Sequence, residues 1–443
     1  MYCGRNLFFF LASSSITSNA TIVKLISGAF WKVNHTLTSL VVDFKQGSIV
    51  IIPSDLLSFC PCLKNLEYSI PHRLSDVLDD SARLDPHKSL LDMRLVAKSI
   101  TEKDLERLLY CCQRLLRLRL TGADNTVFNP IDTLCPSLKI FGCNTDKYSH
   151  VQRLESLNGE QHADGLQQLN THSGGVGVAA SAILPLIHRN MHSLKALFVH
   201  IGRREDRPEM AQKYRDLELK NLRRLSFYGN NTKLIQPLIL NSISTCTELT
   251  SFCITSSKDM PLVIRELISL PRLETLRISY PKDGAAGKKK LIQLLNRYAN
   301  ISKPGRHLKC VALRYCKTLI TDAVLDSLAG VQSLEDIFFE GWSDITSHGM
   351  EKFYKKIGNN LTAIRLTELD VVNDSTLITI SSNSDNLKRI ELGKLKNLSD
   401  QGIKELVDRA PKLQTLNISN CVSITLTIIN YAKTKLRYVT FTK

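Results

Sequence analysis

Long apolar stretches, catalytic motifs and zinc-type cysteine pairs are all missing from this 443-residue chain. No run of about eighteen apolar residues occurs, so the sequence excludes a transmembrane helix of ordinary length, and no membrane partner is expected. It has no nucleophile elbow, no H-E-x-x-H sequence and no nucleotide-binding fingerprint. Cys60 and Cys62 flank a proline and Cys111 adjoins Cys112, which is not the paired C-x-x-C spacing of zinc sites. We therefore expect no enzyme activity, no catalytic residue, no bound metal and no cofactor.

Aromatic and acidic residues are also scarce. Aromatic side chains make up 7% of the chain, and 42 acidic residues stand against 58 lysines and arginines, which gives a formal net charge of +16. An excess of positive charge suits an acidic partner. Nucleic acid is less favoured than an acidic protein, because no RNA- or DNA-binding motif is present and few aromatic side chains are available to stack on bases.

A leucine register, in contrast, returns about every 26 residues. Each unit opens with an apolar triplet at the spacing L-x-x-L-x-L, and ten of the fourteen steps between leading leucines fall between 24 and 28 residues. The leading residues are Leu37, Leu63, Leu90, Leu115, Leu138, Leu194, Leu222, Leu249, Leu273, Leu308, Leu334, Leu361, Leu387, Leu413 and Leu436. A fixed period of this length indicates stacked supersecondary units.

Each unit has the pattern of a strand, a turn, a helix and a return. The alternation within the triplet indicates a strand with one buried face. After the strand LKCVALRY, Thr321 or Asp322 can cap a helix start, and Val324, Leu325 and Leu328 can form its buried stripe. A right-handed helical crossover places successive strands parallel. We therefore expect an α/β solenoid of about fifteen or sixteen parallel strands, with strands on its concave face and helices on its convex face.

Cysteines and prolines recur at fixed distances from the leading leucines. The cysteines that stand three residues before or eight residues after a leading leucine are Cys60, Cys112, Cys135, Cys246, Cys316 and Cys421. The prolines that stand two residues before a leading leucine are Pro61, Pro136, Pro271 and Pro411. These positions make residues 37–443 resemble leucine-rich-repeat proteins, more narrowly the cysteine-containing, ribonuclease-inhibitor-like repeats of F-box receptors. The resemblance implies a horseshoe-shaped solenoid that holds a protein target on its concave face.

Half of the twelve cysteines are thus explained as small apolar residues packed inside repeats. They do not make a disulfide framework, so the sequence indicates a reducing compartment. We expect a cytoplasmic and/or nuclear protein.

Two long steps predict insertions into one solenoid that spans residues 37–443, at about 144–190 and 281–307. In the first, about 158–177 is interpreted as a mobile loop and about 178–191 as a helix that rejoins the solenoid.

In the second insertion, GAAGKKK lacks the spacing of a phosphate-binding loop and is interpreted as a basic loop that enters a helix. The buried stripe of that helix is expected to be Leu291, Leu294 and Leu295.

Residues 1–36 are interpreted as a truncated or degenerate N-terminal repeat, because LFFFLA from Leu7 fits the strand triplet.

Residues beside and between the last two apolar positions of each triplet are expected to point away from the core. They are rich in arginine and aromatic residues, which anchor protein interfaces. The candidate partner-binding residues are Arg117, Arg119, Phe198, Arg224, Tyr228, Arg277, Arg314, Phe338, Trp342, Arg365 and Arg389. Arginine binds carboxylates and phosphates at two points, so we expect a protein target with an acidic or phosphorylated segment. Because these side chains are expected to face solvent, replacing Arg277, Arg314 and Arg365 by alanine should leave thermal stability nearly unchanged.

Two functions remain open. The resemblance implies a substrate receptor similar to the F-box subunits of SCF-type cullin ubiquitin ligases, which direct ubiquitin-dependent degradation and dock a ligase adaptor through the F-box. Residues 1–36 contain no LP-x-E-type opening and no helical trio, so an adaptor is expected only if an F-box lies upstream. The alternative is a free-standing scaffold or regulator of another protein, which needs no F-box.

Overall fold

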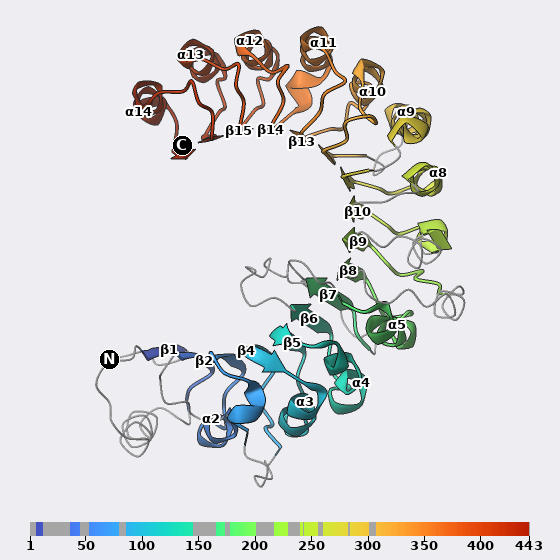
Figure 1. The fold of residues 1–443 in the computed structure, drawn as a ribbon, viewed down its shortest axis with the longest axis vertical. Helices are drawn as coiled ribbons and strands as arrows, with labels where there is room; N and C mark the ends of the chain where they lie inside the picture. The colour runs from blue at the N-terminus through green and yellow to red at the C-terminus, as the bar shows by residue number, and fades with distance from the viewer. Residues whose placement is uncertain are drawn as a thin grey trace. The chain divides into compact units, whose positions relative to one another are not determined.

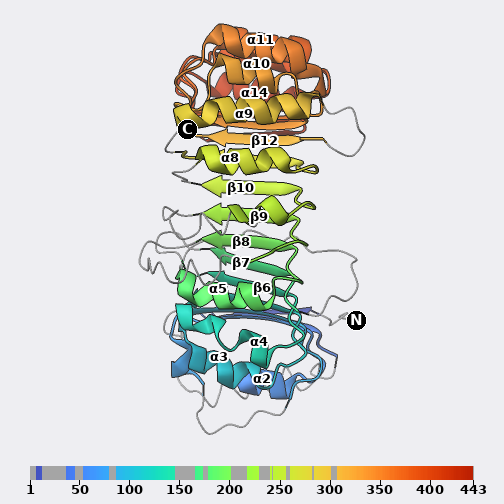
Figure 2. The same ribbon diagram turned by 90° about the vertical axis from the view of Figure 1, so that its right-hand side faces the viewer.

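The chain divides into two compact units, Met1–Asn221 and Leu222–Lys443. The computed structural model describes residues 6–11, 36–44, 53–78, 86–144, 165–172, 178–200, 217–228, 240–241, 243–255, 260–281, 284–300 and 307–442. Within each unit, parallel strands form one layer and helices cover one side of it (Figures 1 and 2).

In the first unit, each strand pairs in parallel with the next strand along the chain. The strands are β1 Asn6–Leu11, β2 Ser39–Phe44, β3 Asn65–Ser69, β4 Asp92–Ile100, β5 Arg117–Ala123, β6 Ile140–Asn144, β7 Gln168–His172 and β8 Ala196–His200. The helices are α2 Pro53–Phe59, α3 Glu102–Leu109, α4 Ile131–Leu134 and α5 Ala180–Arg189, with 3₁₀ turns η1 Leu74–Asp76 and η2 Asn125–Phe128. The strand expected near the N-terminus is confirmed as β1, although Ala12 lies outside the described residues.

The second unit repeats the same order. Its strands are β9 Arg224–Tyr228, β10 Ser251–Thr255, β11 Thr275–Ser279, β12 Cys310–Arg314, β13 Asp336–Glu340, β14 Ala363–Thr367, β15 Arg389–Gly393, β16 Thr415–Ser419 and β17 Tyr438–Thr442. Its helices are α8 Met260–Ser269, α9 Gly284–Ala299, α10 Asp322–Leu328, α11 Ser347–Ile357, α12 Asp374–Asn383, α13 Asp400–Arg409 and α14 Leu426–Lys435, with a 3₁₀ turn η3 Gly358–Asn360. Within this unit, the strands line the inner side of the curve and the helices the outer side (Figure 1).

The core of each repeat is built from its leucine triplet. Leu387, Ile390 and Leu392 are all fully buried, and the same positions are buried in the neighbouring repeats. Burying each such side chain contributes about 1.5–3 kcal/mol relative to leaving it exposed. The helix stripe Val324 and Leu325 closes the other side of the core. The predicted α/β fold class is therefore confirmed, and the order of elements is that of a leucine-rich-repeat solenoid.

Aspartates at helix starts tie one repeat to the next. The Asp374 carboxylate accepts hydrogen bonds from the Ser399 backbone N at 2.9 Å and from its Oγ at 2.5 Å. Asp322 binds Thr346 in the same two-point way, at 2.9 and 2.7 Å. Of the two residues expected to cap α10, Thr321 holds the N-cap position but forms no side-chain cap bond. The Asp322 carboxylate instead accepts from the backbone N of Thr346, at the start of helix α11 in the next repeat. These bonds satisfy backbone donors that a helix start would otherwise leave open.

The loop expected over 158–177 is wrong for Gln168–His172, which forms strand β7 between β6 and β8. Residues 158–164 and 173–177 of that expected loop lie outside the described residues. Leu166 stands midway between two leading leucines and is buried, so the long step contains a complete repeat. Its third triplet position is Thr171, also buried, which hides the pattern in the sequence. This repeat accounts for a strand beyond the expected number. The helix expected over 178–191 is confirmed as α5.

The second long step is explained by helix α9, which has 16 residues. The sequence GAAGKKK lies within its first turns, so the interpretation of that segment as a loop is wrong. The buried stripe of Leu291, Leu294 and Leu295 is confirmed. A longer helix lets the chain lengthen a repeat without disturbing the strand spacing.

Candidate functional site

The strand face of the second unit holds most of the candidate residues. We define it as the first, third and fifth residues of β9–β17, which alternate with the buried positions. Its charged residues are Arg224, Arg277, Arg314, Arg365, Arg389, Asp336, Glu340 and Glu391. Positive charge therefore exceeds negative charge on this face, as the sequence predicts.

Two of these arginines are bound to carboxylates within the face. Arg314 Nε pairs with Glu340, whose residue is only 6% exposed. Arg365 Nη2 donates to both oxygens of Asp336, at 3.0 and 2.8 Å. Removing either arginine would leave a partly or wholly buried carboxylate without its positively charged partner. The structure therefore contradicts the assumption that Arg314 and Arg365 only face solvent, and we expect alanine at these two positions to lower stability.

Phe338 lies between the two paired arginines. The guanidinium carbons of Arg314 and Arg365 lie 5.0 and 5.2 Å from the centre of its ring, within the range of cation–π attraction. The ring is half-buried, so the three side chains form a preformed, largely rigid patch on β12–β14. A preformed patch loses little side-chain entropy when a partner binds.

Arg277 and Arg389 differ from this pair. Both side chains are exposed, and neither forms an ion pair with any residue that the structure describes. Their charges are therefore not neutralised within the face.

Two further candidates, Arg224 and Tyr228, lie half-buried on β9. Burial raises the pKa of the Tyr228 phenol, and the Tyr228 hydroxyl lies 3.7 Å from Cys253 Sγ.

The structure does not place Trp342 on the strand face. Its residue is 4% exposed, its indole packs on Phe339, and its Nε1 donates to the backbone oxygen of Leu313 at 3.0 Å. Trp342 therefore braces the core at the exit of β13, and its expected role in partner contact is wrong.

Three candidates belong to the first unit. Arg117 and Arg119, both on β5, bind the same oxygen of Asp92 at 2.9 and 3.1 Å. Phe198 is half-buried on β8. One carboxylate shared by two guanidinium groups leaves a net positive charge at the start of β4 and β5.

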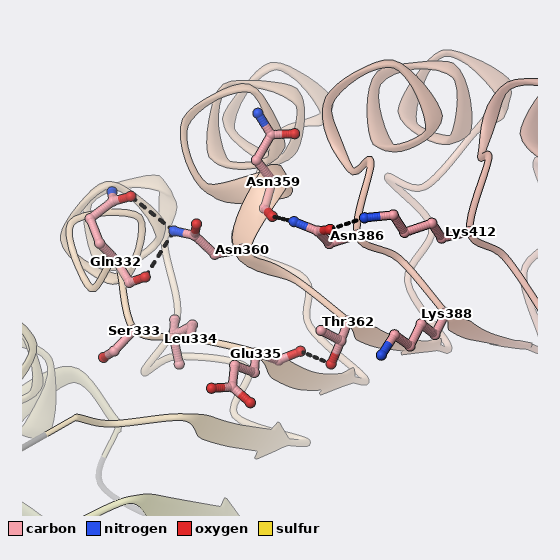
Figure 3. A pocket seen from close by; sticks show the side chains of 10 residues that line it. All are labelled: Gln332, Ser333, Leu334, Glu335, Asn359, Asn360, Thr362, Asn386, Lys388 and Lys412. Carbon is pink, nitrogen blue, oxygen red and sulfur yellow. Dashed lines mark hydrogen bonds between the residues drawn. The ribbon is translucent and has the colours of Figure 1, made fainter. Parts of the chain in front are cut away.

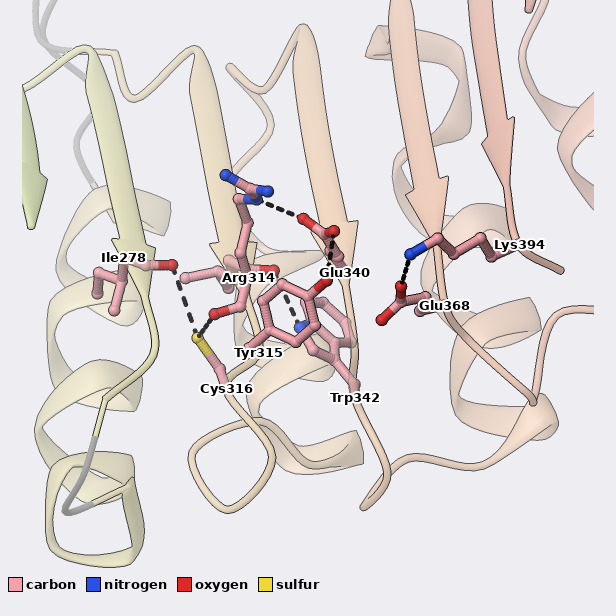
Figure 4. Close-up of polar contacts among 9 residues, drawn as sticks. Ile278, Arg314, Tyr315, Cys316, Glu340, Trp342, Glu368 and Lys394 are labelled. Carbon is pink, nitrogen blue, oxygen red and sulfur yellow. Dashed lines mark hydrogen bonds and ion pairs between the residues drawn. The ribbon is translucent and has the colours of Figure 1, made fainter. Parts of the chain in front are cut away.

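A row of residues that the sequence analysis missed follows the strands of the second unit. The residue directly after β11–β16 is in each case in the left-handed region, with φ between 50° and 66°. These residues are Tyr280, Tyr315, Gly341, Glu368, Lys394 and Asn420. Each donates its backbone N–H to the last residue of the next strand, as Tyr315 does to Glu340 at 2.6 Å. The repeated position after the triplet could have revealed this rim, which Figure 4 shows in part.

Side chains along the rim also bind one another. The ring of Tyr280 stacks on that of Tyr315, with centroids 4.5 Å apart and an angle of 15° between the planes. The Tyr315 hydroxyl donates to Glu340 at 2.9 Å (Figure 4). Glu368 pairs with Lys394, and hydrogen bonding to this lysine lowers the pKa of the Glu368 carboxyl. The rim thus combines an aromatic stack with charged pairs.

A polar groove of about 660 Å³ opens near the starts of the strands in the same unit (Figure 3). Its lining residues are Gln332, Ser333, Leu334, Glu335, Asn359, Asn360, Thr362, Asn386, Lys388 and Lys412. The amides bridge repeats, since Asn360 Nδ2 donates to the Gln332 backbone oxygen at 2.8 Å and Asn386 Nδ2 to that of Asn359 at 2.9 Å. The amides of this groove therefore serve the stacking of repeats.

No cluster of three or more His, Cys, Asp or Glu side chains within the described ranges could hold a metal ion. Among the helices that the structure describes, none is long and apolar enough to cross a membrane. The six cysteines at repeat positions are buried, as predicted, and all the cysteines in the described part of the chain are free thiols.

No known protein-family model matches the sequence, and no curated protein matches it. Solved structures that resemble the chain include the crystal structure of the Rad7 and Elc1 complex in yeast, with 13% identity and a TM-score of 0.47 over 76% of this chain and 77% of that one. Another is a leucine-rich-repeat protein of Leptospira interrogans, with 15% identity and a TM-score of 0.37 over 93% of this chain and 98% of that one. The assignment of the fold rests on this chain's own repeat register and element order.

Proposed function

We propose that this protein is a non-catalytic recognition solenoid that binds an acidic segment of a protein partner on the strand face of its second unit. The observation that carries the proposal is the exposure of Arg277 and Arg389 without carboxylate partners in the described structure. A guanidinium binds a carboxylate or phosphate at two points, and a phosphorylated segment would fit the same surface.

The separation of the two arginines sets the size of the partner. Arg277 lies on β11 and Arg389 on β15, four strands apart. At about 4.8 Å between strands, this spacing is on the order of 20 Å. A partner that neutralises both charges must therefore present acidic groups over that distance, and it would pass the Phe338 patch between them.

Fluorescence anisotropy with three labelled ligands tests the class of partner. The ligands are a glutamate-rich peptide, a lysine-rich peptide and a random-sequence RNA oligomer. We expect the glutamate-rich peptide to bind, with affinity that falls as salt rises, and the lysine-rich peptide not to bind. Tighter binding of RNA than of every acidic peptide would favour a nucleic-acid function instead.

The finer role that we propose is a substrate receptor similar to the F-box/leucine-rich-repeat subunits of SCF-type cullin ligases, acting in the cytoplasm and/or nucleus. The spacing of cysteine and proline in the repeats supports it, and the buried free thiols are consistent with a reducing compartment. Contact with a ligase adaptor requires an F-box upstream of the sequence. Co-purification of a cullin-ligase adaptor with the tagged full-length protein tests this role. Its absence would favour a free-standing scaffold.

A further inference from the structure

The ring of Tyr280 stacks on Tyr315 and is otherwise largely exposed. The residue is 45% exposed, and its hydroxyl forms no hydrogen bond with the residues that the structure describes. One face of the ring is covered by Tyr315, which is itself held by Glu340. A rigid ring with a supported back and an open side offers a large apolar contact at low entropic cost.

The backbone at this position makes the presence of tyrosine informative. Tyr280 has φ 52° and Tyr315 has φ 51°, in the left-handed region that costs a bulky residue about 1 kcal/mol. Asn420, in the same rim, has a residue type that tolerates this conformation more easily. Strained residues persist where the surroundings or a function maintain them. The backbone bond from Tyr280 N to the Arg314 oxygen, at 3.0 Å, maintains the conformation and does not depend on the side chain. The Tyr315 side chain also binds Glu340, whereas the Tyr280 side chain only stacks on Tyr315.

The rim stack lies at the end of the strand that carries Arg277. The side chains of Arg277 and Ser279 point to the strand face, and Tyr280 follows directly. Three residues of extended chain place Tyr280 about 10 Å from Arg277 along the strand direction. An exposed cation and an exposed aromatic surface are thus set one short peptide segment apart.

We propose that the partner's acidic segment carries a tryptophan, phenylalanine, tyrosine or proline three residues from the acid that Arg277 holds, and that this side chain rests on the open face of Tyr280. The inference rests on the proposed function and adds a position-specific feature to it. An extended peptide advances about 3.3 Å per residue, so three residues that lie along β11, beyond the stretch that crosses the strands toward Arg389, match the distance from Arg277 to the ring.

Short synthetic peptides with one glutamate and one tryptophan at varied separation, in a glycine–serine background, test the inference against a glutamate-only peptide. We expect the peptide with a separation of three residues to bind about two- to tenfold more tightly than the glutamate-only peptide. Tyr280→Asn, which suits the backbone conformation, should abolish this gain, and Tyr280→Phe should keep it. Tyr110→Asn, which removes an exposed tyrosine from the first unit, is the matched control and should change nothing.

Equal binding of all glutamate peptides by the parent, or a gain that survives Tyr280→Asn, would overturn the inference and leave the proposed function intact. Failure of every acidic peptide to bind the parent would overturn both. Circular dichroism of each variant establishes that the fold is retained.

Discussion

Arg365 and Asp336 form a two-point contact, in which one guanidinium nitrogen donates to both carboxylate oxygens across neighbouring strands. Both side chains are about a quarter exposed, so solvent screens the pair only in part. Arg277, on the same face, is exposed and has no such partner in the described structure. The arginines of the strand face therefore divide into those that hold the face together and those with charge left for a partner.

We expect Arg365→Ala to lower the free energy of unfolding by about 1 kcal/mol, because Asp336 loses its partner and Phe338 loses one of its two cations. Arg277→Ala should change it by less than about 0.5 kcal/mol. Urea unfolding of both variants measures the difference. Equal effects would show that the ion pair contributes nothing to stability.

Leu392→Asp should lower the free energy of unfolding by more than about 3 kcal/mol, because it places an unpaired charge in the fully buried core of β15. The flanking repeats should unfold first, since each repeat contacts only its neighbours. Hydrogen exchange followed by mass spectrometry locates the loss of protection. Asn417→Asp, on the strand face of β16, is the control, and a similar loss in that variant would contradict the assignment of the two faces.

Asp374→Ala should destabilise the second unit by about 1–2 kcal/mol, because the Ser399 backbone N and hydroxyl both lose their acceptor. The nearby exposed Asp385→Ala should have little effect. Thermal unfolding compares the two. If Asp374→Ala unfolded at the same temperature as the parent, the hydrogen bonds between repeats would not contribute to stability.

Buried thiols should make the protein less stable in alkali. Burial raises the pKa of Cys246 to about 12, whereas the same thiol in the unfolded chain ionises near its ordinary value of about 8.5. Between these values the unfolded state loses the proton first, so stability is full below about pH 8.5 and falls as the pH rises toward 12.

Urea unfolding between pH 8 and pH 10 checks this prediction. We expect the free energy of unfolding that is lost over this range to be smaller by about 2 kcal/mol in Cys246→Ala than in the parent. Cys62→Ala removes an exposed thiol and should leave the pH dependence as in the parent. An unchanged slope in Cys246→Ala would mean that this thiol does not ionise differently in the two states.

The repeat period predicts the fold well because it depends on local spacing of apolar residues, which the sequence displays directly. The sequence does not predict the repeat of β7, because Thr171 takes an apolar position and because polar contacts support this repeat. Asn190 Oδ1 accepts from the Leu166 backbone N at 2.9 Å, and Ser193 Oγ donates to the Leu166 oxygen at 2.8 Å. Such contacts join residues more than twenty positions apart and leave no periodic trace in the sequence.

The candidate site could be predicted only in outline. Strand alternation identifies which arginines point outward, and the common register of the triplets places Arg314 beside Glu340. Arg365, however, stands opposite Glu391 and pairs instead with Asp336 on the other neighbouring strand. The burial of Trp342 depends on the turn after Gly341, whose φ of 66° redirects the chain behind the strand. The register between strands follows from the triplets, but the choice among carboxylates and the direction of that turn do not.

The most direct test of the strand-face proposal is the affinity of a glutamate-rich peptide for the double variant Arg277→Glu and Arg389→Glu. Its matched control is Lys404→Glu with Lys433→Glu, which makes the same change in net charge at exposed positions on helices α13 and α14. We expect the strand-face variant to lose at least about tenfold in affinity, or roughly 1.4 kcal/mol, and the helix variant to bind like the parent apart from a small long-range effect. Loss of binding in the helix variant with retention in the strand-face variant would place the binding surface on the helices and contradict the proposal.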